Sequence, residues 1–453
     1  MGGVHITQIM RWKKQVFSNQ FIRSLSVLMA GTAFANVIIV ATIPILTRLY
    51  TPEEFGELSV FLSILYTVQI LASLRYETAI PLPKKNEDAF HLLVLSSVIV
   101  VFMSIFTFGV ITYFPLAHFL GMPELSKYIW LLSFSLLGMG FFQVLNLWTI
   151  RTEEYPAMSK AKVMMNGGQV SSQMLFGFFH LGLIGLLIGE VLGRFAGTVT
   201  YLKTIRKTEF HLVTFSMKKV ISVMRRYKSF PIISSWSSIL GSLGNQLPVF
   251  FLAVAFDAKT VGLFFLAQKV LTIPEGLLGF SASQVYLSQS AQQSRMSYEK
   301  FTIFFWDIVK KMVFMGATII GLVVLIAPPL VHIVFGAGWE ESGTYIQILS
   351  ILFLMKIIVN PISANFYVFE ALKIQMLSES IRFLLISLSI YLAVFYIESA
   401  TLSILCISLM STLGYLIHGF FSWYVMKRSY SLTARNEKMN SIPTKREVVS
   451  DAR

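Results

Sequence analysis

Long apolar runs recur along the whole sequence and constrain the fold more than any other feature. Runs of about 18 or more residues, long enough for a helix to cross a bilayer, follow one another between residues 24 and 426. Only 13% of the residues are charged and 55% are apolar, whereas soluble domains carry about 25% charged residues. The pattern predicts an all-α polytopic membrane protein.

About twelve membrane spans fit these apolar runs. They are predicted at 24–47, 55–75, 90–114, 128–150, 160–180, 182–202, 230–256, 261–284, 308–334, 343–369, 376–397 and 399–426. An even number of spans places both termini on the same side of the membrane.

The distribution of Lys and Arg predicts which side that is. Most of the 37 basic residues fall in tails and loops on the side of the N-terminus, whereas the loops of the opposite side hold only Arg48, Lys127 and Lys259. Because cytoplasmic loops carry an excess of Lys and Arg, both termini are predicted to be cytoplasmic. The formal net charge of +14 is therefore mainly a topology signal, with weak attraction to anionic membrane lipids, and does not indicate a nucleic-acid partner.

Several kinds of chemical site lack their sequence signals. Cys406 is the only cysteine, so a disulfide within the chain is excluded, and the seven histidines show no metal-ligand spacing. The sequence contains no phosphate-binding GxxxxGK[ST] loop, so direct use of ATP is not expected. No cleavable signal peptide is expected in the basic, polar residues 1–23. We therefore predict no catalytic residues, no metal site and no bound cofactor.

Two pairs of short stretches predict an internal repeat. FPLAHFLG at 114–121 is matched by PPLVHIVFG at 328–336, and YTPEEFG at 50–56 by FDAKTVG at 256–262. Each pair falls at an equivalent point of the predicted topology, which indicates two six-helix lobes related by a parallel repeat, with the substrate pathway between them. The predicted parts are a cytoplasmic N-terminus 1–23, an N-lobe 24–202, a basic cytoplasmic linker 203–229, a C-lobe 230–426 and a cytoplasmic tail 427–453.

Two regions resemble a known family. GTAFANVIIVATIPILTRLYTPEEFGELSVFLSI at 31–64, followed by LRYETAIPLPKKNEDA at 74–89, resembles the opening of Wzx-type polysaccharide flippases. FGAGWEESGTYIQILS at 335–350 resembles the outer loop and following span of the same family. These flippases belong to the multidrug/oligosaccharidyl-lipid/polysaccharide (MOP) exporter superfamily, and the resemblance implies two six-helix lobes around a central cavity.

The activity implied by this resemblance is translocation of an undecaprenyl-pyrophosphate-linked oligosaccharide by alternating access. The substrate would move from the cytoplasmic to the periplasmic leaflet of the bacterial inner membrane. The implied partners are membrane lipids, polysaccharide polymerase and chain-length proteins. The sugar repeat and the final polymer stay open, whether lipopolysaccharide O-antigen, capsule, exopolysaccharide or a cell-wall glycan.

Arg75 is the first candidate for a substrate contact. It ends the predicted span 55–75, where a charge in or near hydrocarbon costs at least about 2.5 kcal/mol. A guanidinium stays ionised and offers a planar fork of donors that matches phosphate oxygens. The resemblance implies cavity arginines at the inner end of the second span, and Arg75 matches that place. The alternative is a topology anchor whose side chain extends to lipid phosphates.

Two further cations are candidates for the substrate pathway. Lys269 lies well inside the predicted span 261–284, and its alternative is an ion pair with Glu275 across the bend at Pro274. Arg48 lies on the outer side, where it is placed to receive the substrate head group. Its alternative is an ion pair with Glu53 or Glu54.

Uncharged and paired polar residues within the spans have other expected roles. Asn36, Asn245 and Gln246 are candidates to line a sugar pathway, or else form interhelical hydrogen bonds. Glu190 and Arg194 share a helix face at i, i+4 spacing and are predicted to form a structural ion pair. For Lys356, a lumenal position and one directed to the membrane surface both stay open.

Transport against a gradient needs an energy source, and the resemblance implies coupling to an H⁺ or Na⁺ gradient. The candidate coupling residues are Glu275 and Glu379, the latter with Gln375 one turn earlier. The alternative for Glu379 is a partnership with Arg382.

Two rival functions are considered. A multidrug or anionic-metabolite exporter of the same superfamily would share the fold, although the cations Arg75 and Lys269 disfavour cationic drugs. A polysaccharide polymerase or ligase would need a sizeable outer loop with paired catalytic carboxylates, and every predicted outer loop is short. We therefore predict a secondary-type transporter rather than an enzyme.

Overall fold

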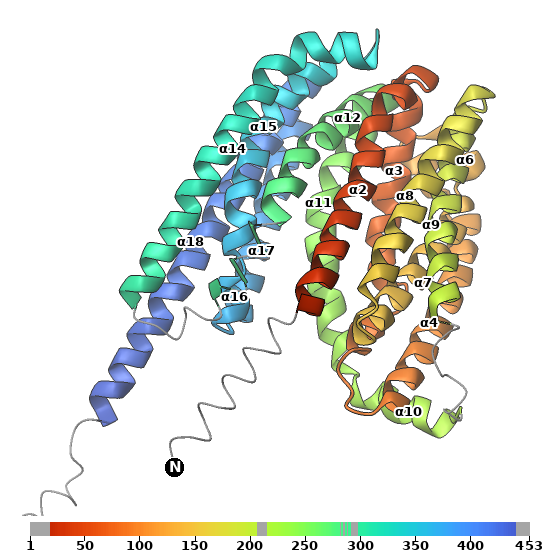
Figure 1. Cartoon of the computed structure of the whole chain (residues 1–453). Helices are drawn as coiled ribbons and strands as arrows, with labels where there is room; N and C mark the ends of the chain where they lie inside the picture. Colours follow the sequence, from red (N-terminus) through yellow and green to blue (C-terminus); the bar gives the residue numbers. More distant parts are fainter. Residues whose placement is uncertain are drawn as a thin grey trace, which may run out of the picture. The chain divides into compact units, whose positions relative to one another are not determined.

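The computed structural model describes residues 19–205, 215–280, 282–283, 286–287, 289–290 and 298–440 (Figure 1). All regular structure within these residues is helical. The predicted all-α class is therefore confirmed.

The first half of the chain contains most of the short helices. They and the long helices are α2 (Asn19–Leu49), α3 (Pro52–Val68), η1 (Gln69–Leu71), η2 (Tyr76–Ala79), α4 (Asn86–Tyr113), α5 (Leu116–Phe119), α6 (Pro123–Tyr128), α7 (Leu131–Arg151), α8 (Tyr155–Phe178), α9 (Leu183–Ile205) and α10 (Met217–Arg226). Each predicted span up to 182–202 overlaps one long helix.

The second half contains longer helices. They are η4 (Phe230–Ser234), α11 (Ser235–Ala255), α12 (Ala258–Pro274), η5 (Glu275–Phe280), α14 (Tyr298–Phe335), α15 (Glu341–Ile362), α16 (Asn365–Val368), α17 (Leu372–Tyr396) and α18 (Ala400–Asn440). The helices α14 and α18 continue well past the predicted spans 308–334 and 399–426, because polar residues also favour helix once it has begun.

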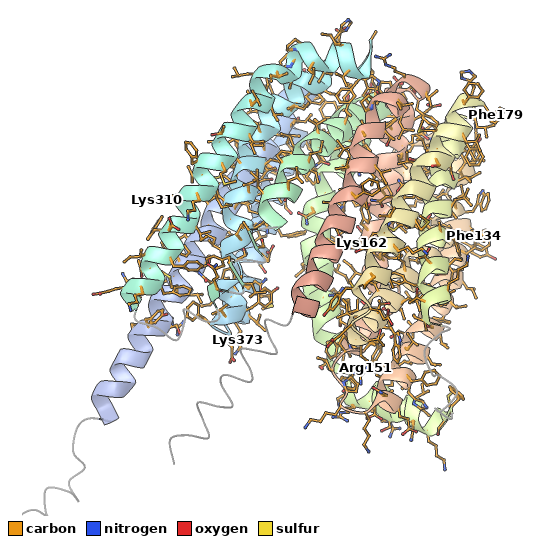
Figure 2. The ribbon with its side chains drawn as sticks, viewed as in Figure 1. Phe134, Arg151, Lys162, Phe179, Lys310 and Lys373 are labelled. Atoms are coloured by element: carbon orange, nitrogen blue, oxygen red, sulfur yellow. The ribbon has the colours of Figure 1, made fainter. Side chains whose placement is uncertain are left out.

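Eleven helices among the described residues are long and apolar enough to cross a membrane. The remaining predicted span, 160–180, corresponds to α8, a 24-residue helix that packs against α2 and α9. Its polar side chains find protein partners. Lys162 donates to the Thr32 hydroxyl at 3.2 Å and Asn166 to the Ala35 carbonyl at 2.8 Å (Figure 2). α8 therefore combines a polar composition with a position among membrane helices.

Large aromatic side chains face outward from the N-terminal helices. Phe134 and Phe179 project away from the ribbon (Figure 2) and are 44% and 63% exposed. Extensive exposed apolar surface on such helices is expected where lipid tails replace water as the solvent.

The described chain divides into two compact units. Unit 1 contains the described residues up to Leu266 together with Val331–Glu340, and unit 2 contains Ala267–Leu330 and the described residues from Glu341. This division falls inside α12, whereas the predicted lobes divide at the linker 203–229. The lobe boundaries and the parallel repeat stay predictions.

Each unit has its own packing. In unit 1, the Thr51 hydroxyl and the Glu54 carboxylate form a capping box that starts α3, with Pro52 in its first turn. In unit 2, an apolar cluster joins Tyr286, Phe301, Phe305, Ile362 and Met426. These contacts fix the ends of the long helices.

Candidate functional site

The chain breaks its helix where Arg75 occurs. α3 ends at Val68, and a short 3₁₀ turn follows. Leu74 and Arg75 then take the left-handed conformation, with φ of 50° and 62°. For residues with a Cβ this conformation costs roughly 1–2 kcal/mol each. Such strain persists only when surrounding contacts impose it, and it clusters at functional sites.

Arg75 and Glu77 form a loose, half-buried ion pair. Arg75 Nη1 lies 3.7 Å from Glu77 Oε1, and the side chains are 25% and 3% exposed. The Arg75 Nε is buried and has no hydrogen-bond partner among the described residues. Since a guanidinium carries five N–H donors, the pair leaves donor capacity on Arg75 for an anion.

Glu77 is held by neutral donors from the turn before it and from α7. The Ser73 hydroxyl donates to Glu77 Oε2, and Gln143 Nε2 donates to Oε1 at 3.2 Å. Gln69 in turn donates to Gln143 Oε1 at 2.7 Å. Burial raises the pKa of the Glu77 carboxyl, and Ser73 and Arg75 oppose that rise. Glu77 is thus a fixed, poorly hydrated partner for Arg75.

Sequence reasoning missed Ser73, Gln69 and Gln143 as supports of this site. One signal was available, because Gln143 is an isolated amide inside the predicted span 128–150. An amide there needs a protein partner. That the partner is Glu77 follows only from the packing of α7 against the end of α3.

Arg151 organises the loop after Glu77. Its Nη1 donates to the Pro83 carbonyl at 2.8 Å, and its Nη2 donates to Asn86 Oδ1 at 2.9 Å. The same Nη1 lies 3.3 Å from the Pro81 carbonyl oxygen. Arg151 (labelled in Figure 2) therefore holds residues 80–86 in place by hydrogen bonds. It is also one of the basic residues from which the membrane topology was predicted.

The helix α10 docks on the start of α4 (Figure 1). Ion pairs join Lys219 to Glu87, and Arg226 Nη1 to Asp88 Oδ2 at 3.9 Å. The Tyr76 hydroxyl, next to Arg75, donates to the Met224 carbonyl at 3.2 Å. The basic linker thus supports the Arg75 segment directly.

Arg48 lies in the last turn of α2, at its C-terminal end. Its exposed side chain donates through Nη2 to the Ile333 carbonyl at 3.2 Å. Among the described residues no ion pair joins it to Glu53 or Glu54, so that alternative is wrong; Glu54 is occupied by the capping box. Beside it, buried Trp339 donates to the Thr47 carbonyl at 3.1 Å. Both bonds hold residues 331–340, which are the end of α14 and the turn after it, against the end of α2.

Three further candidate residues, Glu275, Lys269 and Lys356, lie in unit 2. Glu275 begins η5 directly after Pro274, and Asn360 Nδ2 donates to its Oε1 at 3.2 Å. Lys269 lies partly buried on α12. The Lys356 ammonium lies 4.3 Å from the centre of the Phe353 ring. Asn360 is a partner that sequence reasoning did not name.

The predicted helix-face ion pairs are present. Arg194 Nε donates to Glu190 Oε1 at 2.8 Å, and both side chains are largely buried. In unit 2, Arg382 Nη1 donates to Glu379 Oε2 at 2.8 Å. The pair predicted from spacing for Glu190 and Arg194 is therefore confirmed, and the partnership with Arg382 that was the alternative for Glu379 is present.

The amide side chains among the candidate residues make few hydrogen bonds within the described part of the chain. Gln375 donates to the Tyr367 hydroxyl at 3.3 Å and not to Glu379. Asn36 and Asn245 are exposed and Gln246 is half-buried, and within the described residues none of the three makes a hydrogen bond. Among the described residues these three therefore show no interhelical hydrogen bond, and both of their predicted roles stay predictions. In the part of the chain that the structure describes, no group of three or more His, Cys, Asp or Glu is placed to hold a metal ion.

Comparison with known sequences places this chain in a family. The family described as polysaccharide biosynthesis protein matches residues 45–344, well over half of the chain. The chain belongs to this family. It is also 24% identical over 339 residues to the capsular polysaccharide biosynthesis protein CapF of Staphylococcus aureus, covering 69% of this chain and 77% of CapF.

Solved structures show which fold the family member adopts. A lipid II flippase, MurJ, in an inward closed conformation is 12% identical, with a TM-score of 0.69 over 92% of this chain and 93% of that chain. A multidrug resistance MATE family transporter of the MOP superfamily, in an inward-facing conformation, is 14% identical, with a TM-score of 0.70 over 90% and 99%. The fold is similar to that of both transporters, and the chain is a multi-pass membrane protein.

Proposed function

We propose that this polysaccharide biosynthesis family member is a flippase for lipid-linked oligosaccharides, with Arg75 as a contact for the pyrophosphate of the substrate. The family and the fold, similar to both a lipid flippase and a drug transporter, support transport as the activity. The observation that carries the choice of substrate is the buried Nε of Arg75, which lacks a hydrogen-bond partner within the described ranges and lies beside a loose ion pair.

The chemistry of the substrate explains why such an arginine is needed. A polyprenyl tail can stay in lipid while the head group crosses, but a bare pyrophosphate cannot enter hydrocarbon. Charge-assisted hydrogen bonds from a guanidinium to phosphate are short and strong. Because Glu77 lies 3.7 Å from Nη1 rather than at hydrogen-bond distance, an incoming anion competes with a weak partner.

The remaining candidates are assigned in the same proposal. Lys269, Arg48, Asn36, Asn245 and Gln246 contact the pyrophosphate or the sugars along the pathway. Glu275, Glu379 and Gln375 belong to coupling with an H⁺ or Na⁺ gradient. The substrate is an undecaprenyl-pyrophosphate-linked oligosaccharide of the bacterial inner membrane, the termini are cytoplasmic, and polymerase and chain-length proteins act with the flippase.

A multidrug or anionic-metabolite exporter is the second candidate, because the fold matches the MATE transporter as well as it matches the flippase. The two candidates differ in what they move. An exporter releases a soluble compound, whereas a flippase leaves its substrate in the bilayer.

The test uses purified protein in liposomes that contain a fluorescent polyprenyl-pyrophosphate oligosaccharide. Arrival of the label in the far leaflet is followed by a quencher that cannot cross the membrane, with and without a pH or Na⁺ gradient. Flipping by the wild type above the rate of empty liposomes supports the proposal. No flipping, together with gradient-driven export of a dye or a small anion, contradicts it and selects the exporter.

A further inference from the structure

Glu57 is a buried carboxyl that the proposed function does not use. It lies near the start of α3, is 6% exposed, and belongs to a run of buried residues over 55–65. Its Oε2 is buried and has no hydrogen-bond partner among the described residues. An ionisable side chain within a membrane span is expensive and marks a functional candidate.

The charges near Glu57 disfavour a carboxylate there. Within the described residues Glu57 forms no ion pair. The ammonium of Lys127, on α6, acts on it but is bound to both carboxylate oxygens of Glu124 at 2.7 Å. Glu124 and Glu54 repel a negative charge on Glu57. Burial and nearby carboxylates therefore both favour the neutral acid.

Two groups act in the opposite direction, and both belong to α6. They are the Leu125 backbone amide and the Lys127 ammonium. The helix α6 packs on α3 (Figure 1). Because α6 covers Glu57 and also carries charges of both signs beside it, the proton affinity of Glu57 depends on how this helix is packed.

The other elements that pack on α3 do not set the charge of Glu57. The helix α11 contains no charged side chain. Arg151 and Lys203 lie in the last turns of α7 and α9. Glu190 of α9 is bonded to Arg194. The charge state of Glu57 is therefore decided by α6 and by its own helix.

Glu57 also adjoins a close crossing of two helices. The preceding residue, Gly56, leaves no space for a Cβ beside the Ala258 carbonyl of α12. At the start of α12, Asp257 accepts a hydrogen bond from a backbone amide of that helix at 2.8 Å, and Lys259 is exposed. Water therefore reaches Glu57 only when the packing at this end of unit 1 opens.

We propose that Glu57 is a proton-binding site whose occupancy controls the packing of α6 on α3. With the proton bound, the carboxyl is neutral and α6 stays packed over it. When the proton leaves to water, an O–H bond breaks and a carboxylate remains. Glu54 and Glu124 repel this charge, so that α6 opens and water hydrates it. With the predicted cytoplasmic termini this end of unit 1 is the outer one, and an acidic exterior favours the packed state.

The first experiment detects the proton by infrared difference spectroscopy. A protonated carboxyl has a C=O stretching band that disappears on ionisation. Protein in nanodiscs is titrated from about pH 6 to pH 9, the range in which a buried Glu can hold a proton. The wild type is compared with Glu57→Gln and with the control Glu53→Gln, whose side chain is exposed on the same helix.

The wild type and Glu53→Gln are expected to lose, as the pH rises, an acid band that Glu57→Gln lacks. Identical spectral changes in the wild type and Glu57→Gln overturn the proposal. A second variant guards against a failure of Glu57→Gln to fold. Glu124→Gln removes a neighbouring negative charge and releases Lys127, so the band should be lost at lower pH than in the wild type. An unchanged midpoint contradicts the charge argument.

The second experiment follows the packing of α6. Amide hydrogen exchange of residues 123–128, corrected for the intrinsic pH dependence of exchange, reports how well this helix is protected. In the wild type and Glu53→Gln the protection should fall as the acid band disappears, and in Glu57→Gln it should stay constant. Protection that does not change with pH in the wild type, or that falls equally in Glu57→Gln, overturns the control of packing by the proton. Neither experiment uses transport, so a failure of the flipping assay counts against the proposed function alone.

Discussion

Gly56 and Gly262 pack against each other's helices by reciprocal contacts. A Cβ on Gly56 of α3 would overlap the Ala258 carbonyl of α12, and a Cβ on Gly262 would overlap the Pro52 carbonyl of α3. These residues belong to YTPEEFG and FDAKTVG, the stretches paired in the sequence as a repeat. These two stretches thus form a close helix crossing in unit 1, at the end of α3 opposite Arg75.

We predict that Gly56→Ala destabilises the protein by about 1–3 kcal/mol, because an added methyl must displace backbone rather than a flexible side chain. Gly241→Ala is the matched control, since none of the described residues lies within 4 Å of a Cβ at that helical position. Thermal unfolding in detergent compares the two variants. A melting temperature of Gly56→Ala equal to that of Gly241→Ala would show that the crossing is not tight.

The buried carboxyl of Glu77 is expected to make the free energy of unfolding decrease as the pH rises. Burial raises the pKa of its carboxyl above the ordinary value of 4.5, so the folded state binds the proton more tightly than the unfolded state. The stability from this group is fully present below the ordinary value and is lost as the pH rises through the raised pKa. The melting temperature of the wild type should therefore fall relative to that of Glu77→Gln as the pH increases. A difference that is constant with pH contradicts this prediction.

Arg151→Ala should open the loop that follows η2. The variant loses charge-assisted hydrogen bonds to Pro83 and Asn86, worth about 1.5–3 kcal/mol. The exposed residues Lys84 and Lys85 lie in that loop, so trypsin cleavage there should become faster in Arg151→Ala than in the control Arg225→Ala, whose side chain is exposed on α10. Equal cleavage rates in the two variants would contradict the proposal that Arg151 holds this loop in place.

The same assay tests membrane orientation. With cytoplasmic termini, the loop that contains Lys84 is cytoplasmic too. Trypsin should then cleave it in inside-out vesicles and leave it intact in right-side-out vesicles. The reverse pattern contradicts the orientation predicted from the basic residues.

The long helices could be predicted from sequence because membrane helices need apolar length, a property that each segment carries by itself. The span at α8 was found although Lys160 and Lys162 lower its hydropathy, since it lies between two clear spans. The local pair Glu190–Arg194 also followed from spacing along one helix face.

The partners of Arg75 and His418 could not be predicted in the same way. Gln143 reaches Glu77, and Ser363 reaches His418, only after helices far apart in sequence have packed together. The left-handed turn at Leu74 and Arg75 was missed for a related reason, because neither residue type favours that conformation and tertiary contacts impose it. For Arg48 the alternative from the sequence was an ion pair with nearby acids, yet its hydrogen bond goes to Ile333.

Binding of the substrate head group by Arg75 is the central claim, and one measurement addresses it directly. Purified wild type, Arg75→Ala, Arg75→Lys and the control Arg225→Ala are titrated with polyprenyl-pyrophosphate and polyprenyl-monophosphate lipids of equal tail length. Thermal unfolding and gel filtration first establish that each variant is folded.

The account predicts that the wild type and Arg225→Ala bind the pyrophosphate lipid more tightly than the monophosphate lipid. In Arg75→Ala the pyrophosphate affinity should fall by about tenfold to a hundredfold, as expected for the loss of charge-assisted hydrogen bonds of about 1.5–3 kcal/mol. Arg75→Lys should lie between, because it keeps the charge and loses the fork. Equal pyrophosphate affinity in wild type and Arg75→Ala would contradict the account and leave Arg75 as a partner of Glu77 alone.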